Sequence, residues 1–215
     1  MEPFKIHRGI VAPLDTANVD TDQIIAKQFL KSIHRTGFGE HLFHDWRYHD
    51  DGSENPNFIL NRPAFKKATI LLARNNFGCG SSREHAVWAI QQYGFKAVVA
   101  PKRSAGDGSG IPAFADIFRN NSFKNGLLTV ELPDQEVETI FQRIASEGAL
   151  EMTVDLTRQT LILHSRSELS FSFEIDPANR TRLLEGLDDI GMTLQALPAI
   201  EAFEKRHKTR LGSSV

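Results

Sequence analysis

Cysteine is almost absent from this 215-residue chain, which contains only Cys79. A single thiol excludes an internal disulfide, an all-cysteine zinc site and an iron–sulfur cluster held by this chain alone. The sequence also lacks an excess of either charge, because 25 Lys and Arg residues face 27 Asp and Glu residues. A dedicated nucleic-acid-binding protein would show a basic surplus, so we expect no nucleic-acid partner.

Long apolar runs are missing as well. The N-terminus opens with charged residues, and no stretch approaches the roughly 20 apolar residues of a membrane span. We therefore expect a cytoplasmic protein without a membrane partner. What is present is an ordinary globular composition, with 40% hydrophobic and 24% charged residues and enough chain for a sizeable core.

Short apolar segments alternate with amphipathic ones, which predicts an α/β fold. Residues 68–73 and 97–100 are continuous apolar runs, typical of strands buried on both faces. Between them, apolar residues recur at helical spacing up to Gly94, so the order predicts a βαβ unit. The remaining elements are expected as strands at 4–14, 127–132, 152–156, 160–164 and 169–175, and as helices at 23–31, 41–48, 114–120, 136–147, 180–184 and from 199 onward.

The sharpest motif runs from Gly78 to His85, between the first buried strand and the helix. Its two glycines allow a tight turn and close approach to a ligand. Ser81 and Ser82 are expected at the N-cap or first turn, where free N–H groups and the helix dipole attract an anion. Arg83 adds a planar fork suited to a carboxylate or phosphate. The motif predicts an anion site, and the alternative is a plain capped helix with Arg83 in solvent.

Two further side-chain types in the sequence have reactive or metal-binding chemistry. Cys79 lies near the predicted helix N-terminus, which would lower its pKa, but no partner histidine can be placed. We therefore interpret Cys79 as a packing residue. His41 and His44 are three residues apart, which allows a metal pair on a helix. A solvated or interface segment is the alternative, and we expect no metal site.

An acidic turn precedes the expected helix at 23–31. Asp20 and Asp22 at a helix start usually act as caps. If this turn meets the serine–arginine loop in space, Asp22 would instead orient Arg83 or a substrate hydroxyl. His85 would face either that loop or the core.

Together these motifs closely resemble the small subunits of 3-isopropylmalate dehydratase, in the aconitase superfamily. The string Gly-Ser-Ser-Arg-Glu-His is the hallmark of the superfamily's swivel domain. The resemblance implies one swivelling β/β/α domain over residues 1–215, with a flexible tail at 208–215. The matching elements run nearly end to end, at 18–25, 35–39, 77–90, 93–95, 114–118, 125–128 and 184–190.

The resemblance also implies a reaction: a hydro-lyase of leucine biosynthesis that interconverts 2-isopropylmalate and 3-isopropylmalate by dehydration and rehydration. This chain would bind no cofactor itself and would cap a large subunit that holds a 4Fe–4S cluster and the hydroxy-dicarboxylate substrate. Ser81 would move the proton on carbon, Ser82 and Arg83 would bind substrate carboxylate, and Asp22 and His85 would support them. The implied specificity residues are Phe29, Leu30, Arg35, Thr36 and Phe38.

Residues 102–113 depart from the family pattern, in which the strand before them leads almost directly to the segment 114–118. They are rich in Gly and Ser, so we expect a flexible loop inserted at the surface. At the mouth of the active site, this insertion would alter subunit docking or substrate choice. Two alternatives stay open: the same chemistry on a citramalate- or homoaconitate-type diacid, and a stand-alone anion-binding module.

Overall fold

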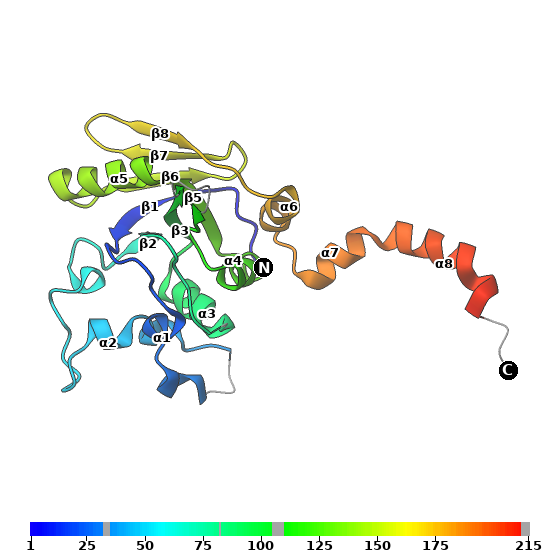
Figure 1. Cartoon of the computed structure of the whole chain (residues 1–215), viewed down its shortest axis with the longest axis horizontal. Coiled ribbons are helices and arrows are strands. Elements are labelled where there is room, and N and C mark those ends of the chain that lie inside the picture. Colours follow the sequence, from blue (N-terminus) through cyan, green and yellow to red (C-terminus); the bar gives the residue numbers. More distant parts are fainter. Residues whose placement is uncertain (32–34, 82, 105–109, 212–215) are drawn as a thin grey trace.

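The computed structural model of the chain describes residues 1–31, 35–81, 83–104 and 110–211. One mixed sheet runs through the body in the order β4-β3-β2-β1-β6-β7-β8, and β5 pairs with β3 (Figure 1). This sheet and its helices confirm the predicted α/β class. The strands are β1 (Ile6–Pro13), β2 (Ala68–Leu72), β3 (Ala97–Ser104), β4 (Gly110–Ile111), β5 (Leu128–Pro133), β6 (Glu151–Asp155), β7 (Thr160–His164) and β8 (Leu169–Ser172).

The sheet has a parallel half and an antiparallel half. Strands β1, β2, β3 and β5 are parallel neighbours, whereas β6, β7 and β8 form an antiparallel meander beside β1. In the parallel half, Ile70 pairs with Ala97 and Leu72 with Val99, and all four side chains are fully buried. The continuous apolar runs therefore mark doubly covered strands, as predicted.

Helices connect and cover these strands. The α-helices are α1 (Thr21–Ile24), α2 (His44–Arg47), α3 (Glu84–Tyr93), α4 (Asp116–Asn125), α5 (Asp134–Glu147), α6 (Pro177–Glu185), α7 (Asp189–Gln195) and α8 (Leu197–Leu211), and the 3-10 helices are η1 (Lys27–Lys31), η2 (Gly39–His41) and η3 (Ile59–Asn61). Because α3 joins the parallel strands β2 and β3, the predicted βαβ unit is confirmed. The predicted apolar face of α5 is buried as well, through Val137, Ile140, Phe141 and Ile144.

The prediction of one helix over 23–31 was wrong. Helix α1 ends at Ile24, and Ile25 adopts an extended conformation before η1 begins at Lys27. Ile24 and Ile25 are both fully buried, and the carbonyl of Ile24 accepts a hydrogen bond from Phe43 N–H at 2.9 Å. Adjacent residues of a helix point about 100° apart, so the break lets both isoleucines enter the core.

The expected loop over 102–113 was wrong in part. Strand β3 continues to Ser104, and β4 pairs back with it, Arg103 opposite Ile111. The chain leaving β4 then lies beside the segment after β2, since Asn76 N–H donates to Pro112 O at 2.8 Å and Phe77 N–H to Ala113 O at 2.9 Å. Residues 105–109 lie outside the described part of the chain. The end of the insertion therefore lies beside the residues that lead into the glycine-rich loop.

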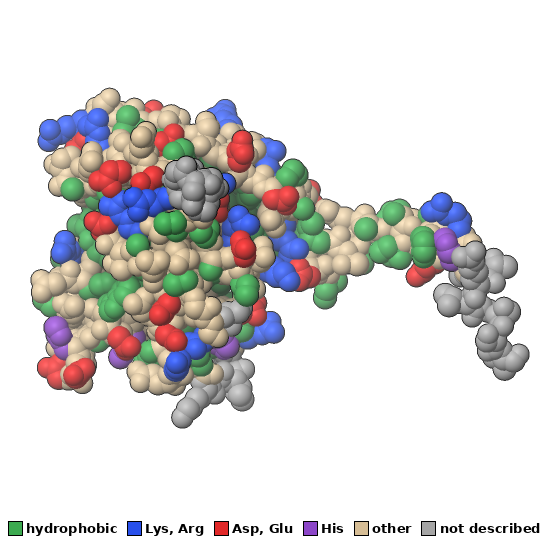
Figure 2. Space-filling model, viewed as in Figure 1, with side chains coloured by type: hydrophobic (Ala, Val, Ile, Leu, Met, Phe, Trp, Pro, Cys, Tyr) green, Lys and Arg blue, Asp and Glu red, His purple; other side chains and the backbone are tan. Residues whose placement is uncertain are grey.

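Helices α7 and α8 extend away from the body as an arm (Figure 1). Apolar side chains stay exposed along this arm (Figure 2): Ile190, Leu194, Leu197, Ile200 and Phe203. The expected flexible tail at 208–215 is helical up to Leu211, and residues 212–215 lie outside the described part. None of the helices in the described ranges combines the length and the apolar character that crossing a membrane requires.

Candidate functional site

Two loops that are far apart in the sequence lie side by side at the candidate site. Gly78 N–H donates to Val19 O at 2.7 Å, and Thr21 N–H donates to Cys79 O at 3.0 Å. The Thr21 hydroxyl also donates to Ser81 O at 2.7 Å. These three bonds fix the backbone up to Ser81 against the acidic turn. The turn and the loop therefore meet.

This contact brings Asp22 to Arg83, which form a hydrogen-bonded ion pair. The Arg83 side chain is only 15% exposed, whereas Asp22 is 40% exposed and also faces Lys27 Nζ at 3.4 Å. A partly buried carboxylate that accepts from a guanidinium restricts the directions in which the guanidinium can point. The prediction that Asp22 orients Arg83 once the loops meet agrees with this geometry.

Glycine is required where the loop turns. Gly78 has φ +75°, and a Cβ atom there would lie 2.2 Å from Phe118 Cγ. Gly80 has φ +87° and faces Asp20 and Thr21. The turn encloses a hollow of about 290 Å³, lined by Thr21, Gly78, Gly80, Arg83, Ala115, Asp116, Ile117 and Phe118.

The expected position of the serines at the start of the helix was wrong. Helix α3 begins at Glu84, and its N-cap residue is Arg83, whose side chain makes no capping bond. Ser81 precedes the helix by three residues and is exposed, while Ser82 lies outside the described residues. The reason is that Arg83 is extended at φ −140° and that the bond from the distant Thr21 keeps Ser81 with the turn. Ser81 is thus presented to solvent rather than used as a cap.

The expected low pKa of Cys79 was also wrong. Burial raises the pKa of this thiol above its ordinary value, and the nearby Asp20 carboxylate raises it further. The sulfur donates to Asn18 O at 3.4 Å. Because Cys79 lies five residues before α3, the helix N-terminus does not offset these effects. The thiol acts as a packing group between the two loops.

The first part of the implied specificity segment is held by aromatic stacking. The rings of Phe29 and His41 are nearly parallel, with centroids 3.8 Å apart. His44 packs at an angle on the same Phe29 ring at 4.8 Å, and Leu30 packs against the core. The histidine pair therefore supports an aromatic residue. In the described ranges no cluster of three or more His, Cys, Asp or Glu side chains could hold a metal ion.

The second part of the segment packs on α3. Phe38 is 1% exposed and meets the His85 ring edge-on at 5.1 Å, while the Arg35 guanidinium lies 5.5 Å from the centre of the Trp88 ring. His85 thus packs against Phe38 and Trp88, and Thr36 is exposed. The segment and the serine–arginine loop are joined through one helix.

Sequence reasoning missed two residues that hold this arrangement. Thr21 fixes the carbonyl of Ser81, and Gln92 bonds to the backbone of Arg35 and Phe38. Thr21 lies inside the acidic motif, so its position was a usable signal. Gln92 had no signal, because a polar residue near a helix end is typical of any solvated surface.

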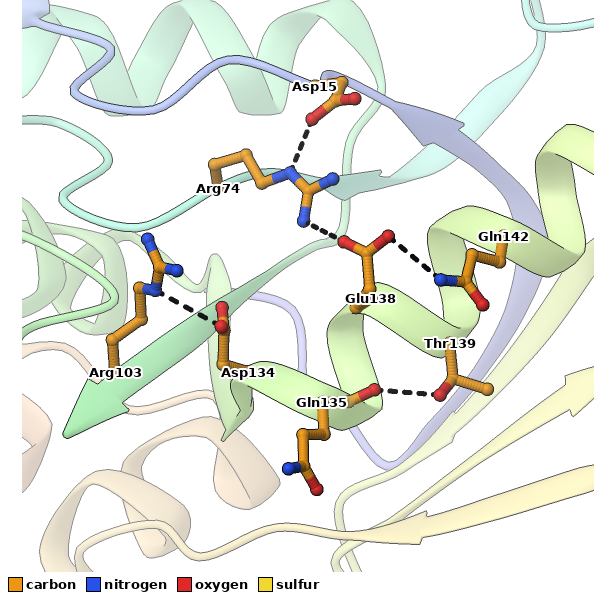
Figure 3. Close-up of polar contacts among 8 residues, drawn as sticks. All are labelled: Asp15, Arg74, Arg103, Asp134, Gln135, Glu138, Thr139 and Gln142. Carbon is orange, nitrogen blue, oxygen red and sulfur yellow. Dashed lines mark hydrogen bonds and ion pairs between the residues drawn. The ribbon is translucent and has the colours of Figure 1, made fainter.

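A larger hollow, of about 570 Å³, lies elsewhere along the carboxyl ends of the parallel strands (Figure 3). Its charges are paired internally, since Arg74 bonds to Asp15 and Glu138, and Arg103 pairs with Asp134 at 3.2 Å. It contains none of the residues predicted for the site.

Similarity to known proteins covers both the serine–arginine loop and the arm formed by α7 and α8. Residues 1–135 match the aconitase C-terminal domain family, and residues 189–210 match the C-terminal domain of the 3-isopropylmalate dehydratase small subunit. The 3-isopropylmalate dehydratase small subunit of Desulforapulum autotrophicum is 50% identical over 209 residues, which cover 97% of each chain. The chain belongs to the family of 3-isopropylmalate dehydratase small subunits.

Other relatives of the family agree. The 3-isopropylmalate dehydratase small subunit of Brevibacillus brevis is 52% identical over 206 residues, covering 96% of this chain and 100% of that one. A solved 3-isopropylmalate dehydratase structure from Methanocaldococcus jannaschii aligns with a TM-score of 0.62 and 22% identity, over 93% of this chain and 99% of that one. That likeness supports the fold, and the arm coincides with the second family segment.

Proposed function

We propose that this chain is the small subunit of a two-chain hydro-lyase that interconverts 2-isopropylmalate and 3-isopropylmalate in leucine biosynthesis. The observation that carries this proposal is the pairing of Arg83 with Asp22 beside an exposed Ser81, in a chain half identical to dehydratase small subunits. The substrate is a dicarboxylate, and an oriented guanidinium matches a carboxylate with two parallel hydrogen bonds. This geometry supports the proposal that the chain contributes one half of an active site.

In this proposal Ser81, as the alkoxide, takes a proton from one substrate carbon while the hydroxyl on the neighbouring carbon leaves as water, with its extra proton supplied by the large subunit. The Ser81 hydroxyl then gives its proton to that neighbouring carbon, while water adds hydroxide to the first carbon and returns a proton to the large subunit. A serine hydroxyl is a weak base and needs a cationic, fixed setting. The Thr21 bond fixes the Ser81 backbone, and Arg83 brings positive charge two residues away. Arg83 and Ser82 bind the substrate carboxylate, and Asp22 keeps the guanidinium aimed.

The other half of the site belongs to a large subunit. We propose that this partner holds a 4Fe–4S cluster, whose open iron would bind the substrate hydroxyl and carboxylate. The single cysteine of this chain cannot supply the cluster ligands, which supports a second polypeptide. Swivelling of this domain would open and close the site, and we place the assembly in the cytoplasm.

Reconstitution tests this function. We expect the purified chain to be inactive alone and to convert 2-isopropylmalate when mixed with the large subunit of the same organism. Formation of the unsaturated diacid is followed by its ultraviolet absorbance, and the large subunit alone is the control. Citramalate and homoaconitate serve as competing substrates. Assembly of the two chains without turnover of 2-isopropylmalate would contradict the proposal, and turnover of another diacid would reassign the substrate.

A further inference from the structure

The side chain of Gln92 connects the end of α3 to the backbone on both sides of Gly37. Gln92 Nε2 donates to Arg35 O at 2.7 Å, and Phe38 N–H donates to Gln92 Oε1 at 2.9 Å. A carbonyl accepts only and an N–H donates only, so these partners determine the orientation of the amide. One side chain thus replaces the hydrogen bonds that a strand or helix would otherwise provide for this turn.

The turn also lies directly against the helix end. A Cβ atom on Gly39 would lie 2.4 Å from the backbone carbon of Gln92, so the two backbones are in close contact. Phe38 is buried against Trp88 and His85, which lie one and two turns before Gln92 on the same helix. Arg35 and Thr36, by contrast, are exposed and present their side chains outward. The amide bonds therefore hold the backbone from which these exposed side chains project.

We propose that Gln92 is a positioning residue for substrate selectivity. It does not touch the reacting atoms, and it holds Arg35, Thr36 and Phe38 at a fixed place relative to Arg83. Both ends of α3 then serve the site, because Arg83 occupies the N-cap position and Gln92 lies about 14 Å further along the helix axis. This inference rests on the proposed function, because it takes Arg35, Thr36 and Phe38 as the residues that recognise the substrate's alkyl group.

The decisive variant is Gln92→Leu, which removes both bonds at nearly constant volume. In the reconstituted two-chain enzyme we expect KM for 2-isopropylmalate to rise by about tenfold and kcat to stay within about twofold, the loss that one or two neutral hydrogen bonds imply. The preference for 2-isopropylmalate over citramalate, measured as a ratio of kcat/KM values, should fall by a similar factor.

Gln91→Leu is the matched control, because Gln91 is the neighbouring residue and its amide donates to Asn125 O at 2.7 Å instead. We expect Gln91→Leu to leave the substrate preference unchanged. Equal preference in Gln92→Leu and the unmutated chain would overturn the inference, as would an equal loss of preference in Gln91→Leu.

Amide hydrogen exchange at Phe38 gives a readout that does not depend on turnover. Gln92→Leu should speed exchange by about tenfold, whereas Gln92→Glu keeps an acceptor and should keep Phe38 protected. If Gln92→Leu does not fold, Gln92→Glu decides, since loss of the bond to Arg35 alone should still lower the substrate preference. An inactive unmutated pair would refute the proposed function. Unchanged amide exchange at Phe38 in Gln92→Leu would refute the role of Gln92 as a positioning residue.

Discussion

The serine–arginine loop and the specificity segment are neighbours on α3, but they are held in different ways. The loop, in its described parts at 78–81 and 83, is fixed by backbone hydrogen bonds, the Thr21 hydroxyl and one ion pair, and it leaves Ser81 exposed. The segment, in its described parts at 29–31 and 35–38, is fixed by ring stacking and a side-chain amide. Proton transfer needs one atom in one place, whereas selectivity needs a shaped surface. Mutations in the loop should therefore lower turnover, whereas mutations in the segment should change substrate preference.

The largest expected effect is on turnover, from Ser81→Ala. Removing a positioned acid–base group should lower kcat on the order of 10³-fold with little change in subunit assembly. The measurement is the reconstituted 2-isopropylmalate assay with size-exclusion chromatography of the complex. The control is Ser53→Ala, because Ser53 lies outside the loop and its hydroxyl bonds to Asp51. Full activity of Ser81→Ala would show that the loop does not carry the proton transfer.

Gly78→Ala should damage the loop through its backbone. A Cβ atom at position 78 would lie 2.2 Å from Phe118, and the residue would have to keep φ at +75°. We therefore expect a loss of about 3 kcal/mol in the free energy of unfolding. Urea unfolding of the isolated chain measures it. At Gly52, φ is +82° but nothing lies within 4 Å. Gly52→Ala should therefore cost only about 1 kcal/mol. Equal losses at both positions would mean that the Phe118 contact is unimportant.

Asp22→Asn should weaken the orientation of Arg83 without removing it. We expect kcat/KM for 2-isopropylmalate to fall about tenfold, less than for a fully buried charged pair, because Asp22 is 40% exposed. Lys27→Met removes the other cation beside Asp22, and it should change kcat/KM by less than about twofold because Lys27 is 75% exposed. A larger effect from Lys27→Met would reverse the assigned roles of the two cations.

His41→Ala should act on selectivity rather than turnover. Loss of its stacking on Phe29 should change the preference between 2-isopropylmalate and citramalate by about threefold, at nearly constant kcat. The exposed His49 offers a control that leaves the Phe29 stack intact. A drop in kcat for His41→Ala with unchanged preference would erase the distinction between loop and segment.

The smallest effect is expected at Cys79. Because burial and Asp20 raise its pKa, less thiolate is present at pH 8 than in free cysteine, so alkylation by iodoacetamide should be slower. The alkylation rate should increase as the pH passes above 9, because more of the thiol is then deprotonated. Alkylation at pH 8 as fast as that of glutathione would contradict a raised pKa.

The sequence predicted the elements whose hydrophobic pattern is strong. Strands β2 and β3, the helix between them and the buried face of α5 follow from apolar runs and helical spacing. The break at Ile25 was not predictable, because it depends on a hydrogen bond from a distant segment. Phe43 N–H donates to the carbonyl of Ile24. The β4 hairpin depends likewise on backbone pairing, which composition does not encode.

At the candidate site, residue types were easier to predict than their contacts. Arg83 and Asp22 were identified from their motifs, and their pairing depended only on whether the two loops meet. The position of Ser81 relative to the helix was wrong because Thr21, sixty residues earlier, decides where the loop ends and α3 begins. Gln92 was missed for the same reason, since its partners are backbone atoms of a distant turn.

The chain has two tryptophans, and in the described residues only one of them contacts the specificity segment. Trp88 lies under Arg35 and against His85, with its indole N–H bonded to Asn125 at 3.0 Å, whereas Trp46 stacks on Phe43. Replacing Trp46 by phenylalanine would leave a single fluorophore, whose emission reports on the environment of Arg35 and Phe38. The protein thus contains its own optical probe for watching a substrate or a partner chain arrive.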